Sequence, residues 1–229
     1  MDGIFHQRLN AEILHSEKRR TTILIFVFLF GLSYQLINKV LLKQADEETV
    51  GLQSQGIIWL FPLAMIALEA CFLFYIISRS RKNHQQIPLG IQYLNVVLEV
   101  GLLSTIILGV SFQFPGIHVL QSPAVFIYFL FIILSTLRLD FGLSFFCGLL
   151  SALSFIIISL LTHGFNFSDS LRVIVILACG IAAGLVARQI RKGINRSLLE
   201  LEKRHRIANL FGQHIAREVA ETMLEHDGL

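Results

Sequence analysis

Charged residues are scarce in this sequence. Only 15% of the 229 residues are Asp, Glu, Lys or Arg, whereas 54% are hydrophobic, and an average soluble domain carries about 25% charge. There are only four prolines, against 19 phenylalanines, and the apolar residues come in long unbroken blocks. This composition excludes an ordinary soluble enzyme and a disordered chain.

Cysteine is also scarce, and histidine is missing from the interior of the apolar blocks. The three cysteines, Cys71, Cys147 and Cys179, lie inside apolar blocks, so they form no disulfide framework and are expected to pack as small side chains. None of the eight histidines lies well inside a block, which disfavours a haem held between facing helices. His118 and His163 lie at the outer ends of neighbouring blocks, so a metal or haem edge bound by this pair is an alternative to two surface histidines. No zinc-type spacing occurs.

Six apolar blocks are each long enough for a helix that crosses a membrane, which needs about 20 residues. Helices are expected because every backbone amide in lipid must be satisfied internally, and the blocks lack the alternation of transmembrane strands. The blocks are residues 21–42, 56–78, 90–112, 117–137, 141–162 and 170–190. We therefore predict an all-α membrane protein with a six-helix transmembrane bundle over 21–190.

The basic residues indicate an orientation. If both termini share one side, that side receives all of the 19 Lys and Arg residues except Lys39, Lys43 and Arg172. The positive-inside rule then places both termini in the cytoplasm of a plasma or inner membrane. The connections between blocks are short, so we expect a small hydrophobic or ionic ligand, if any, beside the lipid bilayer itself. No nucleic acid partner is expected.

Residues 1–20 precede the first block and form the predicted cytoplasmic amphipathic segment. Phe5, Leu9 and Ile13 recur at i, i+4 spacing among polar neighbours. This pattern predicts a short helix that lies on the membrane surface and ends at the basic run of Lys18 to Arg20.

Two carboxylates, Glu69 and Glu99, fall inside apolar blocks, where charge is costly and marks a functional candidate. Each is nine residues from the cytoplasmic end of its block, about 14 Å deep at 1.5 Å per residue. We expect no Lys or Arg at that depth, so two neighbouring carboxyls would share a proton or stay neutral. One interpretation is a site for a proton, cation or ligand. The other is two protonated glutamates bonded to Ser104, Asn95 or a backbone carbonyl.

Two further pairs are candidates for structural or signalling contacts. Arg138 and Asp140 bracket the tight turn between the fourth and fifth blocks. They predict an interfacial ion pair or a helix cap, or else a contact that transmits a signal. Gly180 and Gly184 form a GxxxG spacing, which allows close approach of another helix of the chain or of a second protomer.

The composition changes sharply after residue 190. Residues 191–229 are charged, contain no proline and predict a cytoplasmic helix that continues the sixth block. Leu198 and Leu201 begin a seven-residue pattern typical of a parallel coiled coil. Later positions of the pattern hold His205 and Gly212, which are poor core residues, so the seam is weak and suited to switching between two packings.

One segment of this tail, residues 210–219 (LFGQHIAREV), carries a resemblance. It resembles the element just before the catalytic core of membrane-anchored class III adenylate and guanylate cyclases, roughly Phe-Gly-x-Tyr/His-Val-Ser/Ala-x-Glu-Val-Val. Ile215 and Ala220 depart mildly from this pattern. The resemblance implies a coupling role for the matching residues, which are Phe211, Gly212, Glu218 and Val219.

The resemblance further implies a receptor or anchor domain that signals through the last helix to a cyclase domain in a homodimer. The family's catalytic residues would follow Leu229, so the sequence is expected to be a fragment that is not itself catalytic. No cofactor is expected here; Mg²⁺ and ATP or GTP belong to the absent catalytic domain. The alternatives are a small proton- or ion-coupled transporter, suggested by the carboxylates, and a haem-binding redox sensor, suggested by the histidines.

Overall fold

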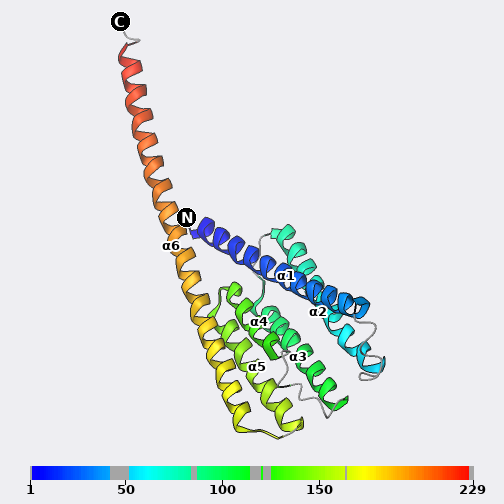
Figure 1. Ribbon diagram of the computed structural model, residues 1–229. Coiled ribbons are helices and arrows are strands. Elements are labelled where there is room, and N and C mark those ends of the chain that lie inside the picture. The colour runs from blue at the N-terminus through cyan, green and yellow to red at the C-terminus, as the bar shows by residue number, and fades with distance from the viewer. Residues whose placement is uncertain are drawn as a thin grey trace. The chain divides into compact units, whose positions relative to one another are not determined.

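The structure is a computed structural model of the chain, and it describes residues 2–41, 52–83, 87–113, 120, 125–162 and 164–226. Helices are the main elements in these ranges, which contain no strand. The chain divides into two units, Met1–Arg188 and Gln189–Leu229. The elements are α1 (Asp2–Leu41), α2 (Leu52–Asn83), α3 (Leu89–Gln113), α4 (Phe126–Ser135), the 3-10 turn η3 (Thr136–Arg138), α5 (Phe141–Thr162) and α6 (Phe167–His226) (Figure 1).

Five of the described helices are long and apolar enough to cross a bilayer, in keeping with a multi-pass membrane protein. The apolar stretches are Glu12–Ile37, Leu60–Arg79, Leu89–Phe112, Phe141–Thr162 and Phe167–Leu201. The all-helical prediction is confirmed for the residues that the structure describes. The predicted count of six crossings is not established.

The fourth predicted block, residues 117–137, accounts for this difference. Its described helical part is α4, with 10 residues, followed by the three residues of η3. An α-helix of that length extends about 15 Å, roughly half of the hydrocarbon thickness. The described part of this block is therefore too short to count as a crossing by itself.

The amino-terminal helix also differs from its predicted form. We expected a surface helix over residues 1–20 and a separate helix from Thr21, but α1 is one helix of 40 residues through that boundary. Nothing between Lys18 and Thr22 stops a helix, since this stretch has neither proline nor glycine. The change from polar to apolar residues marks a change of environment, and the backbone continues through it.

The outward faces of the helices are apolar. Phe26 and Phe30 of α1 are 67% and 75% exposed, and Phe74 of α2 and Phe167 of α6 are 75% and 81% exposed. Large exposed apolar surfaces would aggregate a soluble protein. They are what a bundle needs where its solvent is lipid.

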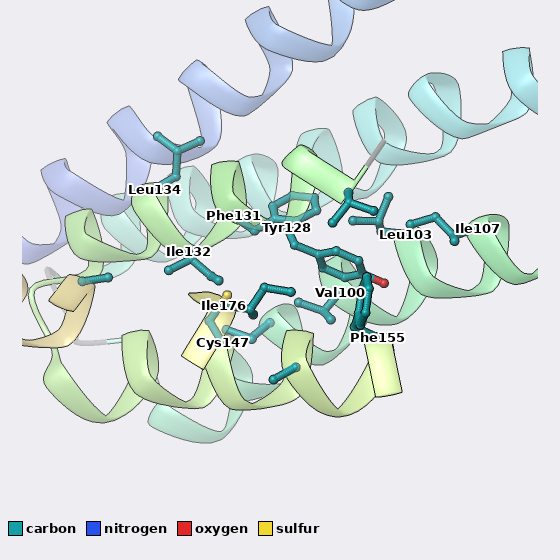
Figure 2. Close-up of a cluster of buried hydrophobic side chains, with 14 of the residues drawn as sticks. Val100, Leu103, Ile107, Tyr128, Phe131, Ile132, Leu134, Cys147, Phe155 and Ile176 are labelled. Atoms are coloured by element: carbon teal, nitrogen blue, oxygen red, sulfur yellow. The ribbon is translucent and has the colours of Figure 1, made fainter. Parts of the chain in front are cut away.

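Side chains from α3, α4, α5 and α6 converge in the main apolar core, shown in Figure 2. Tyr128 of α4 is fully buried there, and its hydroxyl bonds to Ser104 Oγ of α3 at 2.8 Å. Phe155 of α5 and Ile176 of α6 are also fully buried. The single polar group of Tyr128 is therefore satisfied inside an otherwise apolar core.

Helices α5 and α6 approach each other closely at a pair of glycines, Gly148 and Gly180. A Cβ atom built on Gly148 would lie 2.5 Å from the Cα of Gly180, and one built on Gly180 would lie 2.8 Å from the Cα of Gly148. Gly184 lies against Phe141, at the start of α5. The predicted GxxxG pair thus lies against α5, a helix of the same chain.

Candidate functional site: a buried ionic cluster

Glu99, on α3, lies at the centre of a buried cluster of charged side chains. Its Oε1 accepts hydrogen bonds from Arg20 Nη1 at 2.9 Å and from Arg138 Nη2 at 3.0 Å. Asn95, one turn earlier on α3, also donates from its side-chain amide to this oxygen. The Glu99 side chain is 2% exposed. Three donors on one oxygen, two of them cationic, stabilise the ionised carboxylate strongly.

The prediction that no cation reaches the depth of the glutamates was wrong. Arg20, which we expected at the surface, is 1% exposed and pairs with Glu99. Because α1 continues through residue 20, this side chain lies inside the helix bundle. Arg20 Nε also donates to Glu17 Oε2 at 3.2 Å, and its guanidinium lies 6.0 Å from the centre of the Phe72 ring.

The second cation, Arg138, comes from the turn between α4 and α5. Its Nη1 donates to the backbone oxygen of Gln92 at 2.8 Å, so the guanidinium connects η3 to two places on α3. The next residue, Leu139, has a φ of 55°, which reverses the chain directly after Arg138. Asp140 Oδ1 then accepts from the backbone N–H of Leu143 at 3.1 Å, as an N-cap of α5 does. The structure therefore pairs Arg138 with Glu99.

Glu69, on α2, is the other carboxyl of the cluster, and it is fully buried. The Arg20 guanidinium that bonds to Glu99 also lies 6.0 Å from the centre of the Phe72 ring, one turn after Glu69 on α2. Neither of its oxygens accepts from a donor in the described part of the chain. Arg20 Nη2 and Arg138 Nε are also without acceptors there, so neither of these atoms bonds to Glu69. Two ionised carboxylates cannot bond to each other, since neither has a hydrogen to donate.

The formal charges of the cluster do not balance. Three buried carboxyls, Glu17, Glu69 and Glu99, face two buried guanidiniums, Arg20 and Arg138. With every group ionised, one negative charge is left over at the carboxyl that has no donor. An uncompensated charge in a low-dielectric interior is costly. One bound proton, or one other cation, would neutralise the cluster.

The remaining predicted site residues are on α6 or at positions 118 and 163. Leu198 is half-buried and Leu201 is 47% exposed, both on α6. The backbone of the coupling residues Phe211, Gly212, Glu218 and Val219 belongs to α6, but their side chains lie outside the described residues. His118 and His163 also lie outside them. Within the described ranges there is no group of three His, Cys, Asp or Glu residues that could hold a metal ion.

Part of the cluster has a signal in the sequence. Glu17 and Arg20 are three residues apart, the spacing of an intrahelical pair. Asn95 and Glu99 are four residues apart, which places them on one face of α3. The contribution of Arg138 could not be found in this way, because it depends on a turn that brings distant segments together.

Comparisons with known proteins do not assign the chain to a family: no family model, curated protein or solved structure matches it.

Proposed function

We propose that the chain is the membrane receptor or anchor domain of a homodimeric class III adenylate or guanylate cyclase. The observation that carries the proposal is α6, which is one helix from Phe167 to His226. It contains both the apolar stretch Phe167–Leu201 and the cyclase-like residues 210–219. A single helix is a direct physical route by which a change among membrane helices reaches a domain attached to the tail.

The tail also offers a surface for a second copy. Leu201, a core position of the predicted seam, is 47% exposed on α6. Apolar side chains on an isolated helix gain stability by packing against a partner. The heptad positions of Leu198 and Leu201 favour a parallel partner helix, which a homodimer supplies.

The orientation belongs to the same proposal. We place both termini in the cytoplasm of a plasma or inner membrane, because the basic residues concentrate on that side. This arrangement requires an even number of crossings. The proposal therefore requires a sixth crossing in addition to the five apolar helices.

The role of such a domain is mechanical. Nothing in the sequence resembles a phosphate-binding glycine loop, so catalysis, Mg²⁺ and the nucleotide belong to the cyclase domain that the resemblance implies. The contribution of this chain is to hold two such domains face to face and to change their relative rotation.

The test is to attach a class III cyclase catalytic domain after Leu229 and to insert one, two or seven alanines after Arg196. One inserted helical residue rotates everything after it by about 100°, whereas seven residues restore the register of a heptad seam. We expect cyclic nucleotide production in membranes to change strongly with one or two alanines and to return with seven.

The matched control is the same set of insertions directly after Leu229, at the fusion junction. Equal activity for all insertions after Arg196 would contradict the proposal. A response that follows linker length alone, the same at both positions, would contradict it as well.

The transporter alternative rests on Glu69 and Glu99, which are both buried. It predicts flux into proteoliposomes that contain the chain, and loss of that flux in the Glu69→Gln, Glu99→Gln double variant. The haem alternative depends on His118 and His163, outside the described residues.

A further inference from the structure

Glu69 is the one member of the ionic cluster for which the structure provides no donor among the described residues. The charged and titratable groups that face the cluster come from every element around it. Helix α1 supplies Glu17 and Arg20, and α3 supplies Glu99. The turn η3 supplies Arg138, and α5 supplies the thiol of Cys147, which is 1% exposed.

We propose that Glu69 and Glu99 form an intramembrane proton-binding site, in which Glu69 carries the proton and donates it to an ionised Glu99. The bond would join α2 to α3. Arg20 and Arg138 hold Glu99 in its charged form. With this proton bound, the two remaining carboxylates and the two guanidiniums of the cluster balance.

The contacts decide which glutamate holds the proton. Glu99 Oε1 accepts from two guanidiniums and from Asn95, and protonating Glu99 would weaken all three bonds. Protonating Glu69 breaks no hydrogen bond in the described structure, and it gives Glu99 a further donor. The proton therefore belongs on Glu69.

The same contacts favour a proton over a metal ion. Hard cations take about six or more oxygen ligands, and no cluster of three metal-binding side chains occurs among the described residues. Two guanidiniums already bond to Glu99, and their positive charge repels a metal cation. A proton needs only one acceptor and one donor oxygen.

A proton at this position would link acidity to helix packing. When Glu69 loses it, two carboxylates face each other in a low-dielectric interior and repel. The repulsion acts between α2 and α3, while α1 and η3 stay attached to α3 through Arg20 and Arg138. The site is thus a pH-dependent contact of α2 with the rest of the cluster, whatever domain the tail serves.

Infrared difference spectroscopy on the reconstituted full chain tests the proposal, because an un-ionised carboxyl has a carbonyl band distinct from that of a carboxylate. We expect wild-type protein at neutral pH to show one such band that shifts in D₂O. The band should be absent in Glu69→Gln and unchanged in Glu12→Gln, which removes an exposed carboxyl of α1. Raising the pH should abolish the band in wild-type protein.

Three results would overturn the site. One is the absence of a protonated carboxyl band in wild-type protein, and another is a band that survives in Glu69→Gln. The third is loss of the band at constant pH on adding sodium or potassium chloride but not choline chloride, because a metal ion would then replace the proton. Glu69→Gln is close to isosteric with a protonated glutamic acid, so a folded variant is expected.

Discussion

At the scale of single residues, Glu99 and Glu69 illustrate how two chemically identical groups take different roles. Glu99 has two cationic donors on one oxygen, and Glu69 has no donor among the described residues. Position along the sequence does not distinguish them, since both lie about midway along apolar stretches. Their partners distinguish them, and these partners come from segments far away in the chain.

This difference predicts unequal effects of neutralising the two glutamates. Glu99→Gln leaves Arg20 and Arg138 buried without their shared counter-ion, and breaking a buried ion pair on one side costs about 3–5 kcal/mol. Glu69→Gln keeps the shape and the neutral charge of a protonated acid, so we expect a change within about 1 kcal/mol. Thermal unfolding of the two purified variants in one detergent at neutral pH measures the difference. Equal melting temperatures would contradict the assigned charges.

At the scale of elements, the contact between α5 and α6 depends on the absence of side chains. Small residues recur along the buried face of α5, including Ser144, Gly148 and Ser151. Among them, Gly148 lies against Gly180 of α6. Close approach of backbones is a common means of association in lipid, where apolar surface alone gives little preference for protein over lipid.

Gly148→Ala therefore tests the contact. Its Cβ would lie 2.5 Å from the Cα of Gly180, so the two helices must separate, and overpacking of this kind costs about 1–3 kcal/mol. Gly101→Ala is the matched control: a Cβ there meets nothing within 4 Å, and alanine in a helix interior gains about 0.5–1 kcal/mol over glycine. Melting temperatures should fall for the first variant and rise slightly for the second. A fall in both, or in neither, would argue against the close contact.

The elements also show how far apolar blocks predict helices. The fifth block, residues 141–162, coincides with α5, and the third matches α3 to within a residue at each end. The first block was too short, because α1 begins at Asp2 and passes through polar residues that lie outside any apolar pattern. The sixth block and the charged residues after it form one helix, α6, as the sequence predicts. Hydropathy reports where a helix meets lipid, and the backbone of a helix ends for other reasons.

The ionic cluster was predictable only in part. Both glutamates stand out as charges in apolar blocks, and both are buried in the structure. The polar residues 1–20 predict a surface helix that ends at Arg20, and that prediction separates Arg20 from the glutamates. Arg138 reaches Glu99 across 39 residues of sequence, and no local pattern encodes such a contact.

At the scale of the whole molecule, the account depends on two copies meeting along the tail. Two leucines in the described part of that tail, Leu199 and Leu201, are each 47% exposed on α6. Only Leu201 occupies a core position of the proposed heptad seam, whereas Leu199 follows the core position Leu198. The two residues are thus matched in exposure and type and differ in the role that the seam gives them.

The most direct test of the account is disulfide cross-linking in native membranes. Leu201→Cys and Leu199→Cys are each introduced where Cys71, Cys147 and Cys179 have been replaced by alanine, and mild oxidation is followed by non-reducing electrophoresis. The account predicts covalent dimers for Leu201→Cys, and far fewer for Leu199→Cys, because core positions of a parallel seam face each other. Monomers for both variants, or equal dimers for both, would contradict it.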